Sequence, residues 1–338
     1  MKNDKIDFTK LEENARKIFE NGKGILAADE SPSSLEKKFN KFEIKFNEYN
    51  RYKFREILMS VDNLNTYIGG MILHEEIFRG QMENGKSFVD ELIKKGIAPG
   101  IKLDLGLEPF PNDQKITKGL DSLEHRLSTG EFSKAVFAKW RTVFSISKAT
   151  PTEDCINTNN KILAQYAKIC QRNCIVPIVE PEILFDGEHS IEECKLVMKT
   201  VLSNLLYHLN DISIHIPGLI IKPSFVTAGK SSNYPINVQE VSLKTFGCLI
   251  DTIPPAVAGI AFLSGGHTSE NSIKFLNALN NEKGKRTWCL SFSFGRALTD
   301  VVLQNWKGKE SNIPCSKDAF KKKLNEVWLA GQGQYFAN

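Results

Sequence analysis

Short apolar, β-branched runs alternate with helical patterns along the chain, and this alternation constrains the fold more than any other feature. The runs recur roughly every 30 to 45 residues. Eight are present, at residues 24–29, 67–73, 98–105, 137–145, 174–184, 218–225, 259–266 and 287–298. Strand–helix alternation predicts a parallel sheet with right-handed crossovers. Eight units predict an α/β fold, a single (β/α)₈ TIM barrel, with a doubly wound open sheet as the alternative.

Helical patterns separate these runs. Residues 190–209 place apolar side chains on one stripe at helical spacing, and Ser190 with Glu193 forms a capping box at the start. Residues 158–171 show a similar stripe. No linker or composition break divides the chain, so one domain is expected over residues 1–338. Within it we expect an N-terminal helix at about 8–21, a charged, solvated loop-and-helix insert at about 36–56 and a short C-terminal segment at about 316–338.

The composition excludes several classes of function. With 44 basic and 40 acidic residues, the net charge of +4 is too small to indicate a nucleic-acid partner. No apolar run is long enough to span a membrane, so no membrane insertion is expected. The N-terminus is charged and has no apolar signal core. The seven cysteines are odd in number and scattered, which is typical of reduced thiols in a cytoplasmic protein.

Charged and polar residues interrupt strands that a barrel normally buries on both faces. They are Asp29, the pairs Lys102 with Asp104, Lys139 with Arg141, Glu180 with Glu182 and Ser291 with Ser293, and Lys222. Spacing by two places each pair on one face of its strand. If that face is the barrel interior, lysines and carboxylates converge at the carboxyl ends of the strands, where barrels carry catalytic residues. The alternative is that these charges face the helices and reach solvent between them.

Lysines together with carboxylates suit Schiff-base chemistry. A lysine amine among other cations has a lowered pKa and can attack a carbonyl group to form an imine. The protonated imine withdraws electrons, so a neighbouring C–C or C–H bond can break and leave an enamine. Glu180 can supply general acid–base catalysis, and a second lysine can stabilise developing negative charge. No metal or other cofactor is needed, and the HEE sequence at 74–76 does not match the HExxH zinc motif.

Two glycine-containing segments end the last two predicted strands, SGGH at 264–267 and SFGRAL at 293–298. Barrels commonly hold phosphate in the loops after strands 7 and 8. Glycine lets backbone N–H groups approach phosphate oxygens, and Arg296 can bind them through its guanidinium fork. Alone, SGG is also a common turn sequence, but in this position beside Arg296 it predicts a phosphate site.

The motifs closely resemble those of class I fructose-bisphosphate aldolases, the metal-independent Schiff-base type. They are GKGILAADES (22–31), YIGGMIL, GIKLD, FAKWR, CQRNCIVPIVEPEIL, LIIKPSFVT, PPAVAGIAFLSGG and SFSFGRAL, in the family's order from about residue 10 to 335. The resemblance implies reversible cleavage of a phosphorylated sugar, fructose 1,6-bisphosphate, to dihydroxyacetone phosphate and glyceraldehyde 3-phosphate. It also implies a homotetramer in the cytosol, acting in glycolysis and gluconeogenesis. Cytoskeletal or membrane-protein-tail binding is a second role known in the family.

The resemblance assigns catalytic roles to five residues. Lys222 matches the Schiff-base lysine, and Glu180 matches the residue that handles carbinolamine dehydration and proton transfer. Lys139 and Asp29 match residues around the imine and the carbon 4 hydroxyl, and Glu182 is an acidic neighbour that orders the lysines.

The resemblance also assigns two phosphate-binding ends. Residues that match the carbon 1 phosphate site are Ser264, Gly265, Gly266, Ser293, Gly295 and Arg296. Residues that match positions at or near the carbon 6 end are Ser31, Ser34, Lys38, Arg51, Lys102 and Arg141. Lys38 stands where the family usually has arginine, so a single ammonium group replaces the two-pronged guanidinium at this phosphate contact. Animal members carry a further tail whose terminal tyrosine assists proton exchange at the enamine, so we expect slow enamine protonation here.

Two other functions are alternatives to this one. A transaldolase-like or deoxyribose-phosphate aldolase-like enzyme shares a strand lysine and a phosphate site but has a different motif set. A non-catalytic scaffold on the same fold would be expected to lose at least one of the four residues Lys222, Glu180, Lys139 and Asp29. Fructose 1-phosphate and sedoheptulose 1,7-bisphosphate stay open as further substrates.

Overall fold

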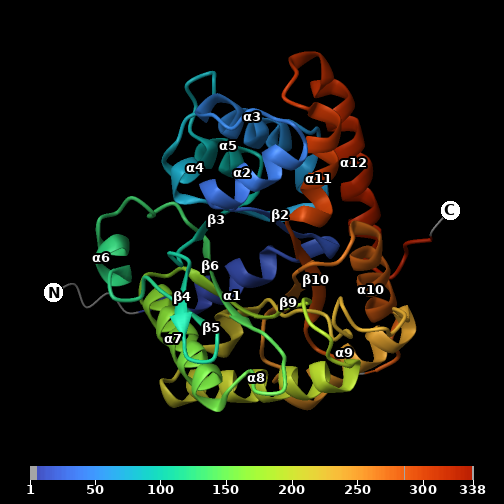
Figure 1. The fold of residues 1–338 in the computed structure, drawn as a ribbon. Helices are drawn as coiled ribbons and strands as arrows, with labels where there is room; N and C mark the ends of the chain where they lie inside the picture. Colours follow the sequence, from blue (N-terminus) through green and yellow to red (C-terminus); the bar gives the residue numbers. More distant parts are fainter. Residues whose placement is uncertain (1–5, 285, 337–338) are drawn as a thin grey trace.

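Eight parallel strands close into a barrel in the computed structural model, which describes residues 6–284 and 286–336 (Figure 1). In order around the barrel they are β1 (Gly24–Ala28), β2 (Ile68–Leu73), β3 (Ala98–Lys102), β6 (Phe137–Phe144), β7 (Val176–Ile183), β8 (Ile220–Ile221), β9 (Gly259–Phe262) and β10 (Cys289–Phe294). All eight lie within the predicted runs. The predicted (β/α)₈ barrel is therefore confirmed, and the open sheet is wrong.

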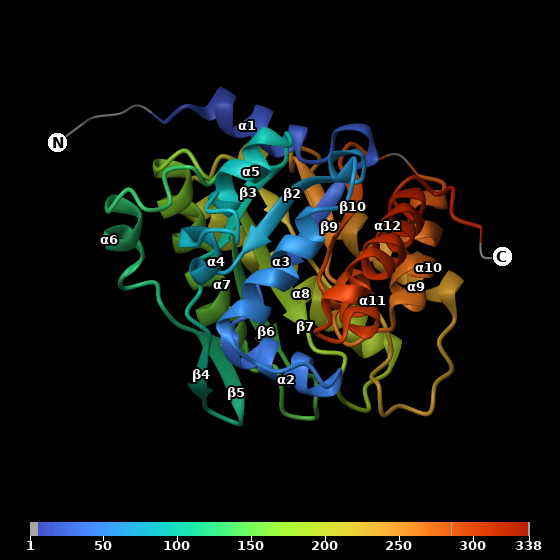
Figure 2. The same cartoon turned by 90° about the horizontal axis from the view of Figure 1, so that it is seen from above.

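One pair of strands lies outside the barrel and was not expected. β4 (Leu107–Phe110) and β5 (Gln114–Thr117) form an antiparallel hairpin after β3. Its turn contains Asn112 and Asp113, both with positive φ. β4 is mostly exposed, so it lacks the apolar run that marks the barrel strands. The hairpin projects at the same end of the barrel as α2 (Pro32–Lys41) (Figure 2).

The helices surround the barrel (Figure 1). Besides α2, they are α1 (Phe8–Lys17), α3 (Glu48–Met59), α4 (Glu75–Arg79), α5 (Phe88–Lys94), α6 (Leu123–Ser128), α7 (Glu153–Arg172), α8 (Ile191–Asp211), α9 (Val238–Thr252), α10 (Ser269–Asn281), α11 (Arg296–Trp306) and α12 (Ile313–Ala330). The capping box of Ser190 and Glu193 is confirmed at the start of α8. None of these helices is long and apolar enough to cross a membrane.

The insert at 36–56 differs from its expected solvated state. It forms most of α2 and α3, and Phe39 and Phe54 within it are fully buried. Their rings pack edge to face, and Phe39 also contacts Trp306 of α11. The many charges of the segment indicated a solvated surface, but its apolar side chains are buried by packing against α11. Much of the C-terminal segment at 316–338 belongs to an 18-residue helix, α12.

Two core layers lie on either side of the strands. The inner cluster fills the barrel with side chains such as Ile25, Ala27 and Phe137, and α1 packs against it at the amino-terminal end of the barrel. The outer cluster, which includes Leu26 and Ala28, lies between the strands and the helices. Residues of the two layers alternate along strands such as β1, β6, β7 and β9, as period two requires. This alternation determines which residues at the strand ends face the interior.

Candidate active site

The polar residues at the strand ends belong to the barrel interior. Asp29 continues the inner row of Ile25 and Ala27 along β1, and Lys222 continues the row of Ile220 beyond β8. The same alternation holds for the charged pairs on β6 and β7. The alternative that these charges face the helices is therefore wrong.

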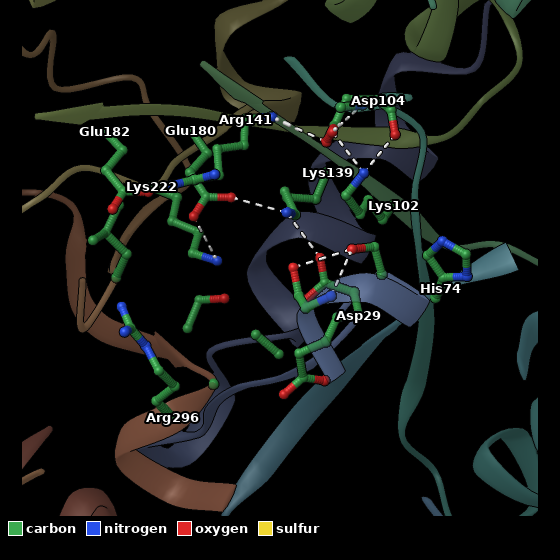
Figure 3. A pocket seen from close by; sticks show the side chains of 18 of the residues that line it. Asp29, His74, Lys102, Asp104, Lys139, Arg141, Glu180, Glu182, Lys222 and Arg296 are labelled. Atoms are coloured by element: carbon green, nitrogen blue, oxygen red, sulfur yellow. Dashed lines mark hydrogen bonds and ion pairs between the residues drawn. The ribbon is translucent and has the colours of Figure 1, made fainter. Parts of the chain in front are cut away.

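A cavity of ≈ 670 Å³ opens at the carboxyl end of the barrel (Figure 3). Of the residues predicted for the site, it is lined by Asp29, Ser31, Ser34, Lys102, Lys139, Arg141, Glu180, Glu182, Lys222, Ser264, Gly265, Ser293, Gly295 and Arg296. Its size is typical of a site for a small organic ligand. The fold thus brings most of the predicted residues into one place, although they span much of the chain.

Four of the lining residues form one buried chain of ion pairs. The Lys222 Nζ lies 3.0 Å from the Glu180 Oε1, and the Lys139 Nζ lies 3.2 Å from the Glu180 Oε2. The Lys139 Nζ also lies 2.8 Å from the Asp29 Oδ2. All four side chains are buried, where charges persist only with partners. Four strands are needed to build this chain, so it forms only in the closed barrel.

The charges of Asp29 and Lys139 stabilise each other. Burial alone would raise the pKa of the Asp29 carboxyl, but the ammonium groups of Lys139 and Lys222 outweigh it and hold that pKa well below its usual range. Burial alone would lower the pKa of Lys139, but Asp29 and Glu180 raise it above its ordinary value. At neutral pH the pair is therefore a fixed ion pair beside Lys222 and not a proton-exchanging one.

Two further ion pairs line the cavity. The Arg141 Nε lies 2.5 Å from the Glu182 Oε2, and the Lys102 Nζ lies 2.6 Å from the Asp104 Oδ1. Burial alone would lower the pKa of Arg141, but the Glu182 carboxylate raises it, so this guanidinium stays charged. The resemblance makes Glu182 an acidic neighbour of the lysines, whereas its ion-pair partner among the described residues is an arginine.

The side of the cavity formed by β9, β10 and α11 suits an anion. Gly265 has φ of +53°, which glycine adopts without strain. Its carbonyl accepts a hydrogen bond from the Arg296 guanidinium. The Ser293 hydroxyl is buried without a hydrogen-bond partner among the described residues. Gly295 precedes α11, whose first N–H groups lack helical partners and favour a negative charge.

Three predicted residues do not line the cavity. The Lys38 Nζ lies 2.7 Å from the Glu30 Oε1 and 2.9 Å from the Thr299 Oγ1. Arg51 pairs with Glu76. The third is Gly266, in the loop after β9, where a Cβ would meet the Phe185 ring. A role for these three in substrate binding stays a prediction.

Sequence reasoning missed several polar residues that line the cavity: Glu30, Ser33, His74, Glu75 and, as a site residue, Asp104. Alternation would have found two of them. His74 stands two residues after the inner residue Ile72, and Asp104 stands two residues after Lys102. Across residues 6–284 and 286–336, no group of three His, Cys, Asp or Glu side chains is placed to hold a metal ion.

Comparisons with known proteins agree with the geometry. Residues 10–338 match the family model described as fructose-bisphosphate aldolase class-I. The chain is 50% identical over 299 residues to fructose-bisphosphate aldolase of Encephalitozoon cuniculi, with 88% of each chain covered. It is 42% identical over 328 residues to fructose-bisphosphate aldolase C-A of Danio rerio, with 96% of this chain and 90% of the relative covered.

A solved structure shares the fold over nearly the whole chain. It is fructose-bisphosphate aldolase from Plasmodium falciparum, in complex with TRAP and a small-molecule inhibitor. The TM-score is 0.95 at 39% sequence identity, with 98% of this chain and 96% of that chain covered.

Proposed function

The chain belongs to the class I fructose-bisphosphate aldolase family, and from this premise we propose which of its residues perform the reaction. The enzyme is a glycolytic lyase that reversibly cleaves fructose 1,6-bisphosphate to dihydroxyacetone phosphate and glyceraldehyde 3-phosphate. The observation that carries the assignment is the buried chain of Lys222, Glu180, Lys139 and Asp29. It supplies an amine nucleophile, a carboxyl group for proton transfer, a fixed cation and a second carboxylate.

Schiff-base formation uses Lys222 and Glu180. Lys222 first transfers a proton from its Nζ to Glu180, and the free amine then attacks carbon 2 of the open-chain ketose and gives a carbinolamine. The Glu180 carboxyl lies 3.0 Å from that nitrogen and donates a proton to the carbinolamine hydroxyl, which leaves as water. The products are a protonated imine on Lys222 and an ionised Glu180.

Carbon–carbon cleavage follows from the charge of this imine. Because the low pKa of Asp29 makes it a weak base, we assign it the orientation of the carbon 4 hydroxyl and assign the proton to Glu180. As Glu180 accepts that proton, the bond between carbons 3 and 4 breaks and its electron pair forms the enamine. Lys139 stabilises the negative charge that develops on the carbon 4 oxygen during this step, and glyceraldehyde 3-phosphate leaves as the aldehyde. Protonation of carbon 3 and hydrolysis of the imine then release dihydroxyacetone phosphate.

The two ends of the cavity accommodate the two phosphates. The carbon 1 phosphate binds among Ser264, Gly265, Ser293, Gly295 and Arg296, where a guanidinium, a helix N-terminus and hydroxyls converge. The carbon 6 phosphate lies toward Ser31, Ser34, Lys102 and Arg141 across the cavity. We also propose that Lys38 and Arg51 act at or near the carbon 6 end and Gly266 at the carbon 1 phosphate, although none of the three lines the cavity.

Reductive trapping tests the catalytic assignment. Incubation with dihydroxyacetone phosphate and borohydride, with EDTA present throughout, is expected to leave a stable adduct on Lys222 and on no other lysine. Peptide mass mapping locates the adduct, and a sample without the ketose is the control. Folded protein that yields no adduct on any lysine would contradict the imine mechanism and favour a scaffold role.

The surface of α8 and α9 supports a homo-oligomer, and the family points to a homotetramer. Leu196 and Tyr207 on α8 are 68% and 64% exposed, and Leu243 on the neighbouring α9 is 54% exposed. Exposed apolar side chains of this size on adjacent helices are typical of subunit interfaces. Light scattering coupled to gel filtration is expected to give a tetramer mass for the natural protein. The double variant Leu196→Asp, Leu243→Asp is expected to give a smaller species, whereas a monomeric natural protein would contradict the proposal.

The other family properties are expected for this chain from its family resemblance. A cytoplasmic location and binding to cytoskeletal proteins or membrane-protein tails stay predictions for this chain. The Plasmodium falciparum relative was solved in complex with TRAP.

A further inference from the structure

His74 lies at the carboxyl end of β2 and lines the cavity (Figure 3). It directly follows Leu73, which pairs with Ala28 of β1 and with Ile101 of β3. These three paired residues belong to the outer core layer. The residue after each of them therefore faces the barrel interior.

His74 is thus level with Asp29 and Lys102, which follow the paired residues on β1 and β3. In Figure 3 its ring stands on the side of Lys102 and across the cavity from Lys222 and Arg296. If the imine forms at Lys222 and the carbon 1 phosphate binds at Arg296, the remote end of a six-carbon bisphosphate extends toward His74.

The neighbouring lining residues on α2 also suit an anion. The Ser31 Oγ lies 3.2 Å from the Ser33 Oγ and 3.1 Å from the Ser34 Oγ. These hydroxyls stand at the N-terminus of a ten-residue helix, whose dipole favours a negative charge there. The nearby Lys102 charge is partly neutralised by Asp104, so further donors are needed to hold a doubly charged group.

The proton position on the His74 ring follows from its hydrogen bond. Its Nδ1 accepts a hydrogen bond from the Glu76 N–H at 3.4 Å, which caps α4. In the neutral ring the proton therefore lies on Nε2. Burial, together with the charge of Lys102, lowers the pKa of His74 and keeps the ring neutral at pH 7. The ring thus offers one N–H donor beyond its role as a cap.

We propose that the His74 Nε2–H binds the carbon 6 phosphoryl group and raises the preference of the enzyme for a bisphosphate over a monophosphate. This inference rests on the function proposed above and adds a specificity residue to it. A neutral N–H donor can orient the phosphoryl group through a hydrogen bond without adding to the positive charge of the site. Fructose 1-phosphate lacks the group that this donor contacts, so its cleavage is independent of His74.

The variants His74→Asn and His74→Gln separate this role from the capping of α4. Asparagine is a good N-cap residue, but its amide is too short to reach the position of Nε2. Glutamine places its amide nitrogen near that position. For His74→Asn we expect the KM for fructose 1,6-bisphosphate to rise about 10- to 100-fold, as for loss of a hydrogen bond to a charged group. We expect kcat to change little, and His74→Gln to recover most of the loss.

Fructose 1-phosphate provides the internal comparison, since its kcat/KM should be unchanged in every variant. His125→Asn on the exposed surface of α6 is the matched control and should leave kcat and KM unchanged for both substrates. If His74→Asn does not fold, His74→Met against His74→Gln makes the same comparison at equal side-chain length.

Three results would overturn the inference. One is an unchanged KM in His74→Asn, and another is an equal loss with both substrates, which would place the contact on the shared sugar or in the fold. Failure of His74→Gln to recover the loss would show that the donor is not the cause. Failure of the natural protein to cleave fructose 1,6-bisphosphate would instead refute the proposed function itself, and the inference with it.

Discussion

Replacing Lys222 by methionine should reduce kcat for fructose 1,6-bisphosphate cleavage by on the order of 10⁵-fold, as expected when a covalent nucleophile is removed. Lys222 is buried beside Glu180, and methionine fills a similar volume without an amine. The rest of the cavity keeps its phosphate-binding groups, so substrate should still bind. Lys222→Arg should be equally inactive, because a guanidinium stays protonated and does not attack a carbonyl. A coupled assay that follows glyceraldehyde 3-phosphate measures the loss.

Lys161→Met, an exposed change on α7, is the matched control and should keep full activity. Circular dichroism checks that the Lys222 variants fold. Activity of Lys222→Met within tenfold of the natural protein would move the nucleophile to another lysine of the cavity, Lys139 or Lys102. Mapping of the borohydride adduct would then identify it.

Replacing Lys139 by methionine should have the second largest effect, a loss of about 10²- to 10⁴-fold in kcat/KM. Lys139 is the only cation between Glu180 and Asp29 in the buried chain of described residues. Without it, two carboxylates stay buried close together, and burial raises the pKa of Asp29 with only the charges of Lys222 and, more weakly, Lys102 to oppose it. Asp29 then takes up a proton as the pH falls, at a pH where the natural enzyme keeps it ionised.

The pH profile therefore distinguishes this electrostatic role from a general loss of structure. The low pKa of Asp29 keeps it ionised well below neutral pH in the natural enzyme. Titration of Asp29 should therefore cause no fall in kcat/KM on the acid side of the profile between about pH 5 and 9. In Lys139→Met, kcat/KM should fall toward low pH within that range, which adds an acid limb to the profile. The double variant Asp29→Asn, Lys139→Met lacks the titrating group and should lose the added limb. A Lys139→Met profile with the shape of the natural one would show that Lys139 does not keep Asp29 ionised.

The barrel and the centre of its site were predictable because both depend on local patterns. Buried parallel strands need apolar runs, and the charged residues inside those runs stand out against them. Spacing by two then places Glu180 with Glu182, and Lys139 with Arg141, on one face of each strand. The resemblance added roles to these residues, whereas their shared face followed from the spacing alone.

The expectations that differed from the structure involve surfaces that neighbouring elements cover or leave open. Phe39 and Phe54 sit among charges, and their burial depends on α11, far along the chain. The β4–β5 hairpin is exposed and carries no apolar run. His74 belongs to no catalytic motif in the sequence, and its place in the cavity follows from the pairing of β2 with β1 and β3.

The residue pattern was enough to establish the strand–helix repeat and the shared face of each charged pair, and the closed barrel decided that this face points inward. The repeat and the shared face depend on neighbours a few residues apart, which the sequence contains directly. Distances and partners depend on the closure and register of the barrel, which bring Asp29 within 2.8 Å of Lys139 and pair Glu182 with Arg141. Burial then set the charge states, because a carboxylate in a low-dielectric interior stays ionised only where the fold supplies a cation.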